Sequence, residues 1–222
     1  MPLIKSISGI RGTIGDREGE DLTKNDIILY TMSFGFWLKS ENRVKSNKIV
    51  VGRDARVSGL MVQGLVLDTL TKMGFDVVCL GLSTTPTVEI AVPIEKADAG
   101  IIITASHNPR EWNALKLLNN KGEFINAEDG KNLMSIADSN PSFDENINLG
   151  SVTFNDSYID THIDLILKLP FIDSESIKKR KLKVVVDAVN STGGIANDNS
   201  QPLKNNEDMS QISNDMDDEI PF

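Results

Sequence analysis

Short apolar runs alternate with helical segments through the first half of the chain, and this alternation is the strongest constraint on its fold. Three runs cover residues 48–52, 75–80 and 99–104, and the segments between them carry apolar residues at helical spacing. Strands joined by helices of this length form parallel pairs through right-handed crossovers. The sequence therefore predicts an α/β fold with a mostly parallel, mixed sheet and helices on both faces.

The same spacing predicts the remaining elements. Helices are expected over the following ranges: 21–38, 58–74, 87–94, 127–137 and 158–169. Ser58 is expected to cap the second of these helices. Two short strands joined by a turn are expected at 115–119 and 122–125, and a further strand is expected at 182–187.

Composition divides the chain into three parts. Residues 139–148 are polar and offer little to bury, which is typical of a domain boundary. We therefore expect a first domain over 1–145 and the start of a second α/β domain, incomplete in this chain, over 155–196. After Ala196, seven acidic residues face one lysine and account for −6 of the net charge of −9. This excess charge and the scarcity of apolar residues predict a disordered acidic tail over 197–222.

Charge and hydropathy exclude several classes of protein. The net charge of −9 argues against direct binding of nucleic acid, and no apolar run approaches the length of a membrane span. The start of the chain lacks the apolar core of a signal peptide, so a cytoplasmic location is expected. Cys79 is the only cysteine and lies in an apolar run, which predicts a buried thiol and excludes an internal disulfide.

A serine follows the apolar run 99–104. Open α/β sheets bind ligands at the carboxyl ends of their strands, so Ser106 is a candidate nucleophile. His107 follows it directly, Pro109 prevents the strand from continuing, and Lys116 lies a short distance downstream. This combination suits phosphoryl transfer, because the serine oxygen can carry the phosphoryl group while positive charge stabilises it. Taken alone, a Ser-His pair more often marks an ordinary polar loop.

Two turns that contain arginine are further candidates. Glycine recurs every third position around Arg11, which allows the backbone to approach a ligand closely, and the guanidinium offers a fixed fork of donors to phosphate. The alternative is a hairpin turn with a surface arginine. Arg53 and Arg56 flank Asp54 at the end of a predicted strand. This arrangement suggests two cations oriented by a carboxylate, with a surface ion pair before a helix as the alternative.

The string Thr104–Pro109, with Asn113 and Lys116 downstream, closely resembles the phosphoserine loop of the α-D-phosphohexomutases. This family includes phosphoglucomutase, phosphomannomutase and phosphoglucosamine mutase. Residues 8–12 resemble the family's amino-terminal loop, whose arginine faces the phosphoserine. The resemblance covers residues 1–196 and implies the fold of the family's first domain, followed by the opening of its second.

The resemblance implies an isomerase that interconverts hexose 6-phosphate and 1-phosphate through a phosphoserine and a bisphosphate intermediate. Ser106 would carry the phosphoryl group and would ligate Mg²⁺ through it. Arg11 would hold the phosphoserine, while His107 and Lys116 would transfer protons and stabilise charge. A supporting or phosphate-binding role is implied for four more residues: Arg53, Arg56, Asn108 and Asn113.

The implied partner is a phosphosugar, together with its bisphosphate intermediate. The amino-terminal loops and residues 112–116 look most like those of phosphoglucosamine mutases, which implies glucosamine phosphate as the substrate. Mannose or glucose phosphate is the alternative. Ala114 follows Asn113 where many members of the family have glycine, which leaves the sugar open.

One departure from the family's pattern bears on activity. Members of the family hold Mg²⁺ with an Asp-Gly-Asp type loop of the second domain, and no Asp-x-Asp-x-Asp string occurs in this sequence. The sugar-reading and distal phosphate-binding loops of the third and fourth domains are also missing from the sequence. Phosphoryl transfer depends on such charge-neutralising groups. We therefore expect little or no mutase activity from this chain alone.

The last residues, Asp217–Phe222, resemble the acidic tip of bacterial single-stranded-DNA-binding proteins, which docks on basic pockets of partner proteins. The resemblance implies a protein partner for this tip. Two further hypotheses follow. One is a non-catalytic fragment whose tip binds DNA-maintenance proteins, and the other is a mutase gene fragment joined to an unrelated reading frame. Loss of partner binding on deletion of Pro221 and Phe222 would support the first.

Overall fold

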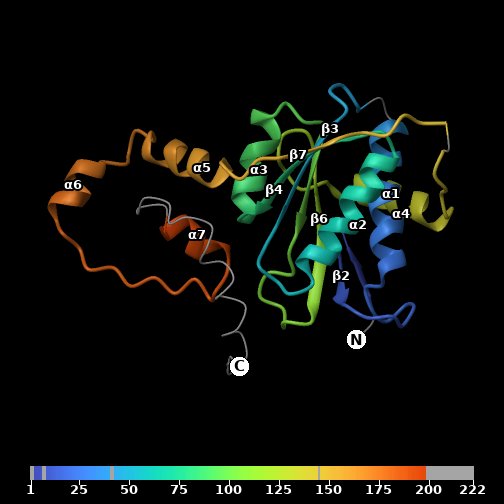
Figure 1. Ribbon diagram of the computed structural model, residues 1–222, viewed down its shortest axis with the longest axis horizontal. Helices are drawn as coiled ribbons and strands as arrows, with labels where there is room; N and C mark the ends of the chain where they lie inside the picture. The colour runs from blue at the N-terminus through green and yellow to red at the C-terminus, as the bar shows by residue number, and fades with distance from the viewer. Residues whose placement is uncertain (1–2, 7–8, 41–42, 145, 199–222) are drawn as a thin grey trace.

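The computed structural model describes residues 3–6, 9–40, 43–144 and 146–198 (Figure 1). In these ranges the chain forms a mixed sheet in the order β1-β2-β6-β5-β3-β4-β7. The strands are β1 (Ile4–Ser6), β2 (Gly9–Thr13), β3 (Lys48–Arg53), β4 (Asp76–Leu82), β5 (Ala99–Ile103), β6 (Trp112–Leu118) and β7 (Val152–Phe154). The helices are α1 (Lys24–Ser40), α2 (Gly59–Lys72), α3 (Thr85–Ile94), α4 (Ala127–Asp138), α5 (Tyr158–Leu167), α6 (Ser174–Lys179) and α7 (Thr192–Asp198).

Parallel and antiparallel pairing occupy different parts of the sheet. Neighbours among β5, β3, β4 and β7 run parallel, whereas neighbours among β1, β2, β6 and β5 run antiparallel. Helices return the chain between β3, β4 and β5, but only a short loop joins β5 to β6, and such a loop reverses the strand. The predicted α/β fold with a mixed sheet is confirmed. The sheet of the described residues is not mostly parallel, since three strand pairs are parallel and three are antiparallel, and the parallel pairs all lie on one side of β5.

Helices cover both faces of the sheet, as the sequence predicts. α1 packs with α2 and α4 on one face, and α3 covers β3 and β5 on the other (Figure 1). Side chains alternate between the faces along each strand, so Val51 packs in the core beneath α1 while Val50 packs with Val88 of α3. Burial on both faces explains why the central strands appear in the sequence as continuous apolar runs.

The sheet continues past the predicted end of the first domain at residue 145. β7 pairs in parallel with β4, with Val152 opposite Val77, and forms the edge of the sheet. α5 then packs on α3, where the Tyr158 hydroxyl donates a hydrogen bond to Glu95 Oε1 over 2.8 Å. Beyond α5 the chain extends away from the sheet (Figure 1).

Two predicted strands are wrong. Residues 122–125 form a single bridge, between Phe124 and Leu118, in place of a second strand. Residues 182–187 form no strand, and Val185 is 97% exposed. A strand needs a neighbour for its backbone hydrogen bonds, and none of the described segments pairs with this one. Ser58 precedes α2 as expected, but its side chain makes no capping hydrogen bond.

The carboxyl-terminal region is described only as far as α7. This helix ends at Asp198, two residues into the predicted acidic tail, and the tip Asp217–Phe222 lies outside the described residues. Across the described ranges, no helix combines the length and the apolar character needed to cross a bilayer. Cys79 is buried in β4, as predicted.

The loop that follows β2 is held by Asp21. Its carboxylate accepts a hydrogen bond from the Thr13 hydroxyl at 2.8 Å and two from the Arg17 guanidinium at 2.8 and 3.0 Å. These bonds, those from Arg17 foremost, hold the pKa of Asp21 well below its usual range. A carboxyl with a lowered pKa stabilises the fold above its unfolded pKa of about 3.9 and loses this contribution as the pH falls through the folded pKa.

We expect Asp21→Asn to lower the free energy of unfolding at pH 7 and to flatten its decline between about pH 5 and 2, because an amide has no charge to lose. Urea unfolding followed by circular dichroism across this range measures both effects. Asp68→Asn is the matched control, since Asp68 pairs with Lys72 on the exposed surface of α2, where ion pairs contribute little. Identical pH slopes for wild type and Asp21→Asn would contradict the assignment.

Candidate active site

Ser106 lies in the serine loop (residues 104–111), which joins β5 to β6. β5 is buried over its whole length, and the chain reaches the surface at Ser106. Ser106 has a φ of 56°, in the left-handed region that residues other than glycine rarely adopt and that costs about 1–3 kcal/mol. Its N–H donates to Thr104 Oγ1 at 3.0 Å. Strained backbone of this kind clusters at functional positions.

The serine loop and two strands enclose a pocket of about 150 Å³. Its lining consists of Arg11, Thr104, Ala105, Ser106, His107, Asn108, Ala114 and Lys116. Arg11 on β2 lies opposite Ala114 on β6, and Lys116 is two residues farther along β6, so these three side chains share one face of the sheet. The lining combines a serine hydroxyl with two cations and includes no carboxylate, so the pocket suits an anion such as a phosphoryl group.

Gly9 allows β2 to lie close against β6. It has a φ of 117°, and a Cβ atom at this position would lie 2.1 Å from the Leu115 carbonyl oxygen. Only glycine fits such a conformation without strain or displacement. The close approach at Gly9 therefore sets the position of Arg11, two residues along the strand.

Two neighbours of Ser106 complete the loop. His107 Nδ1 lies 3.5 Å from Ser106 Oγ, a separation at the outer limit of a hydrogen bond. Asn108 donates to the Ala105 carbonyl twice, from its side-chain amide at 2.7 Å and from its backbone N–H at 3.1 Å. These bonds close a turn with Ser106 at its tip.

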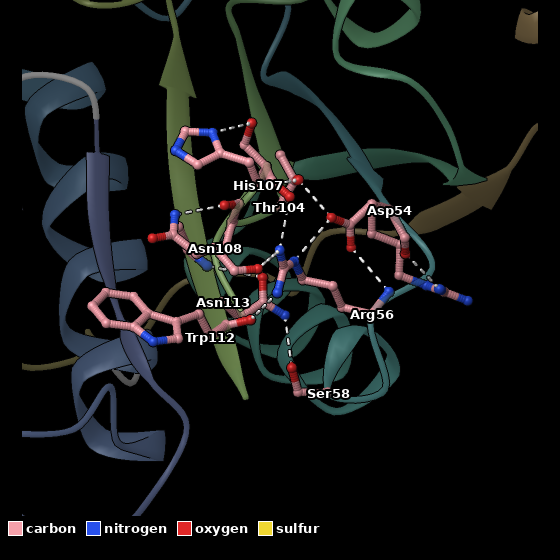
Figure 2. Close-up of polar contacts among 12 residues, drawn as sticks. Asp54, Arg56, Ser58, Thr104, His107, Asn108, Trp112 and Asn113 are labelled. Atoms are coloured by element: carbon pink, nitrogen blue, oxygen red, sulfur yellow. Dashed lines mark hydrogen bonds and ion pairs between the residues drawn. The ribbon is translucent and has the colours of Figure 1, made fainter. Parts of the chain in front are cut away.

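Three of the predicted site residues lie outside the pocket lining. Arg56 donates hydrogen bonds to four backbone carbonyls of the serine loop and of Trp112 (Figure 2). Asn113 is fully buried and donates to Ser58 Oγ at 2.9 Å, which connects β6 to the start of α2 (Figure 2). Arg53 donates to the Asp54 carbonyl at 3.0 Å. These three side chains thus bond to other groups of the protein and do not face the pocket.

Sequence reasoning expected Asp54 to orient the neighbouring arginines, and Asp54 does pair with Arg56. It missed the link from Asp54 to Thr104, and it gave Thr104 no role of its own. The Thr104 hydroxyl accepts from the Ser106 N–H and donates to Asp54 Oδ2 at 2.5 Å, so it links the serine loop to the end of β3. Both residues follow buried strands directly. The sequence signal that could have identified them is that two parallel neighbouring strands end in polar residues, because the ends of such strands meet at one sheet edge.

The described residues do not supply a complete metal site. Among them, no group of three or more His, Cys, Asp or Glu side chains is placed to hold a metal ion. Mg²⁺ prefers carboxylate, phosphate and water oxygens, and the pocket lining offers no carboxylate. Ser106 would contribute a metal ligand only through a phosphoryl group on its oxygen.

Known proteins match the chain over most of its length. A family model described as phosphoglucomutase/phosphomannomutase, alpha/beta/alpha domain I, matches residues 3–143. A phosphoglucomutase/phosphomannomutase from Thermococcus kodakarensis is 35% identical over 186 residues, which cover 83% of this chain and 40% of the relative. A phosphoglucosamine mutase from Helicobacter acinonychis is 30% identical over 183 residues, which cover 82% of this chain and 40% of the relative.

Solved structures share the fold of this chain. A phosphoglucomutase/phosphomannomutase family protein from Burkholderia thailandensis matches with a TM-score of 0.59 and 27% identity, over 74% of this chain and 36% of that chain. A phosphoglucomutase from Paramecium, pp63/parafusin, shares the fold with a TM-score of 0.66 at 13% identity, over 90% of this chain and 41% of that chain. The chain spans about 40% of the length of the curated relatives it matches.

Proposed function

The chain belongs to the phosphoglucomutase/phosphomannomutase family, and on this basis we propose that it carries the phosphoryl-transfer site of a phosphohexomutase. Phosphohexomutases are isomerases that move a phosphoryl group between two positions of a hexose. One observation carries the proposal: Ser106 lines the same pocket as the cations Arg11 and Lys116, and the lining includes no carboxylate. Positive charge at this position offsets the charge of a phosphoryl group on Ser106.

In the proposed reaction, phosphorylated Ser106 donates its phosphoryl group to a free hydroxyl of a hexose phosphate. The bond from Ser106 Oγ to phosphorus breaks as a bond from the sugar oxygen to phosphorus forms, and the proton of the sugar hydroxyl passes to a base. His107 and Lys116 line the pocket and are the candidate bases. The bisphosphate then reorients in the site. Ser106 recovers a phosphoryl group from the other position, and the proton returns to the sugar oxygen released there.

We propose glucosamine phosphate as the substrate, with mannose or glucose phosphate as the alternative. Residues 112–116 support this choice by their likeness to phosphoglucosamine mutases. The relatives carry both kinds of name, phosphoglucosamine mutase and phosphoglucomutase/phosphomannomutase. Mg²⁺ dependence is general in the family, and a phosphoryl group on Ser106 would supply one ligand of the metal. We also propose a cytoplasmic location, which fits a phosphosugar substrate.

Incubation of the full chain with glucosamine 1,6-bisphosphate in buffer with Mg²⁺ tests the function. Because the sequence lacks the Asp-Gly-Asp type loop and the distal phosphate-binding loops, we expect little or no repeated turnover of the sugar and only a slow, single transfer to the serine. We expect intact-mass spectrometry to show the gain of one phosphoryl group, peptide mapping to place it on Ser106, and Ser106→Ala to abolish it. Ser139→Ala, a change outside the pocket lining, is the control and is expected to take up phosphoryl as wild type does. Uptake that persists in Ser106→Ala would overturn the proposal. The glucose and mannose bisphosphates, run in parallel, rank the three sugars.

A further inference from the structure

The side chain of Arg56 binds the backbone of the serine loop. Its Nη2 atom donates to the Ser106 and Asn108 carbonyl oxygens at 2.8 and 2.6 Å. Its Nη1 atom donates to the Pro109 and Trp112 carbonyl oxygens at 2.7 and 2.9 Å. Figure 2 shows these bonds converging on one guanidinium. The side chain is only 11% exposed and does not belong to the pocket lining, so Arg56 acts on the loop from outside the pocket.

Asp54 fixes Arg56 and the start of the same loop. Its Oδ2 atom lies 3.3 Å from Arg56 Nε, and its Oδ1 atom accepts from the Arg56 N–H at 3.0 Å. Oδ2 also accepts from the Thr104 hydroxyl, which in turn accepts from the Ser106 N–H. Ser106 is therefore held from both sides, through its N–H by Thr104 and through its carbonyl by Arg56.

These contacts help to maintain the conformation of Ser106. Hydrogen bonds from a charged donor are stronger than those between neutral groups. The bond from Arg56 to the Ser106 carbonyl therefore opposes the strain of the left-handed φ, and the other three bonds hold the residues that follow Ser106. Without the guanidinium, the contacts of Thr104 and His107 to Ser106 and of Asn108 to Ala105 would remain in the loop.

The same contacts orient the peptide dipoles of the loop. The C=O and N–H of one trans peptide point in opposite directions, so the Ser106 carbonyl that faces Arg56 turns the His107 N–H away from Arg56. The negative ends of these dipoles thus point toward a largely buried cation and not toward the pocket. Such a fixed arrangement favours charge that develops on a phosphoryl group, because the surroundings need no reorganisation.

We propose that Arg56 is a positioning residue for phosphoryl transfer, which fixes the geometry of Ser106 through four backbone carbonyls without touching the phosphoryl group. The inference rests on the proposed role of Ser106 as phosphoryl carrier. It assigns Arg56 a role in the rate of transfer and none in the affinity for the phosphosugar.

The variant Arg56→Lys tests the proposal, because lysine keeps the charge but cannot make four bonds in a planar fork. We expect the maximal rate of phosphoryl uptake from glucosamine 1,6-bisphosphate to fall at least about tenfold, with the half-saturating concentration unchanged within about twofold. Arg43→Lys is the matched control: Arg43 pairs with Asp129 at 2.9 Å, away from the pocket, and its replacement should leave both constants unchanged. A raised half-saturating concentration with an unchanged maximal rate would overturn the proposal.

Hydrogen exchange on the same chains provides a readout that does not depend on chemistry. We expect amides of residues 104–112 to exchange about tenfold faster in Arg56→Lys while those of β3 and β4 keep their wild-type rates. Unchanged exchange in the loop, or equal acceleration throughout the sheet, would overturn the positioning role. If wild type takes up no phosphoryl group, the proposed function fails, and the exchange data still decide whether Arg56 fixes the loop.

Discussion

Replacing Arg11 with glutamine is expected to slow phosphoryl uptake by Ser106 about a hundredfold or more, the size of effect seen when one fixed donor to a developing charge is removed. Arg11 lines the pocket with Ser106, and its Nε atom is buried with no hydrogen-bond partner among the residues that the structure describes. A buried donor of this kind is costly unless a ligand satisfies it. A phosphoryl group on Ser106, as proposed, would be such a ligand.

The uptake assay with glucosamine 1,6-bisphosphate measures this effect, and Arg110→Gln is the matched control. Arg110 belongs to the serine loop and carries the same charge, but it does not line the pocket. Its replacement removes the same net charge at a similar place, and we expect uptake within about threefold of wild type, since exposed charges are screened by salt. Equal losses in both variants would show that Arg11 acts only through net charge.

The substitution Gly9→Ala is expected to lower the free energy of unfolding by about 3 kcal/mol or more, because it combines a left-handed φ with an atomic overlap. The added Cβ would lie 2.1 Å from the Leu115 carbonyl oxygen, and relief of the overlap must separate β2 from β6. Arg11 would move with β2. We therefore expect phosphoryl uptake to fall at temperatures where the variant is still folded.

Urea unfolding measures the change in stability, and Gly64→Ala provides the control. Gly64 lies in α2, and a Cβ there would meet nothing within 4 Å. Alanine in a helix is favoured over glycine by up to about 1 kcal/mol, so this variant should be slightly more stable than wild type. A Gly9→Ala variant as stable as wild type would mean that β2 can move away from β6 without cost.

The parts of the fold that the sequence predicted correctly are those governed by local pattern. β3, β4 and β5 are buried on both faces, so their apolar runs mark them directly. The strand predicted at 182–187 has an equally apolar sequence, yet it is exposed and unpaired among the described residues. Strand formation depends on a neighbouring strand, and the apolar pattern of one segment does not reveal whether a neighbour exists.

The candidate site shows the same limit. Ser106 could be predicted because it follows a buried strand, and the structure brings it together with Arg11 and Lys116, which come from β2 and β6. Arg56 was expected to act as a cation beside the site. Its pairing with Asp54 could be expected from the sequence, but its other partners are carbonyl oxygens. Every residue has a carbonyl oxygen, so no pattern of side chains could have indicated those four. The link from Asp54 to Thr104 joins residues 50 positions apart and required the fold itself.

The backbone contacts of Arg56 also bear on how this site tolerates mutation. Because the guanidinium binds carbonyl oxygens, the side chains at positions such as 110 and 111 can change without the loss of any of these four bonds. Side chains of the loop can therefore vary while the four bonds from Arg56, which Asp54 holds in place, keep the shape of its backbone. A loop held in this way can acquire a different preference for substrates while its reacting serine stays in place.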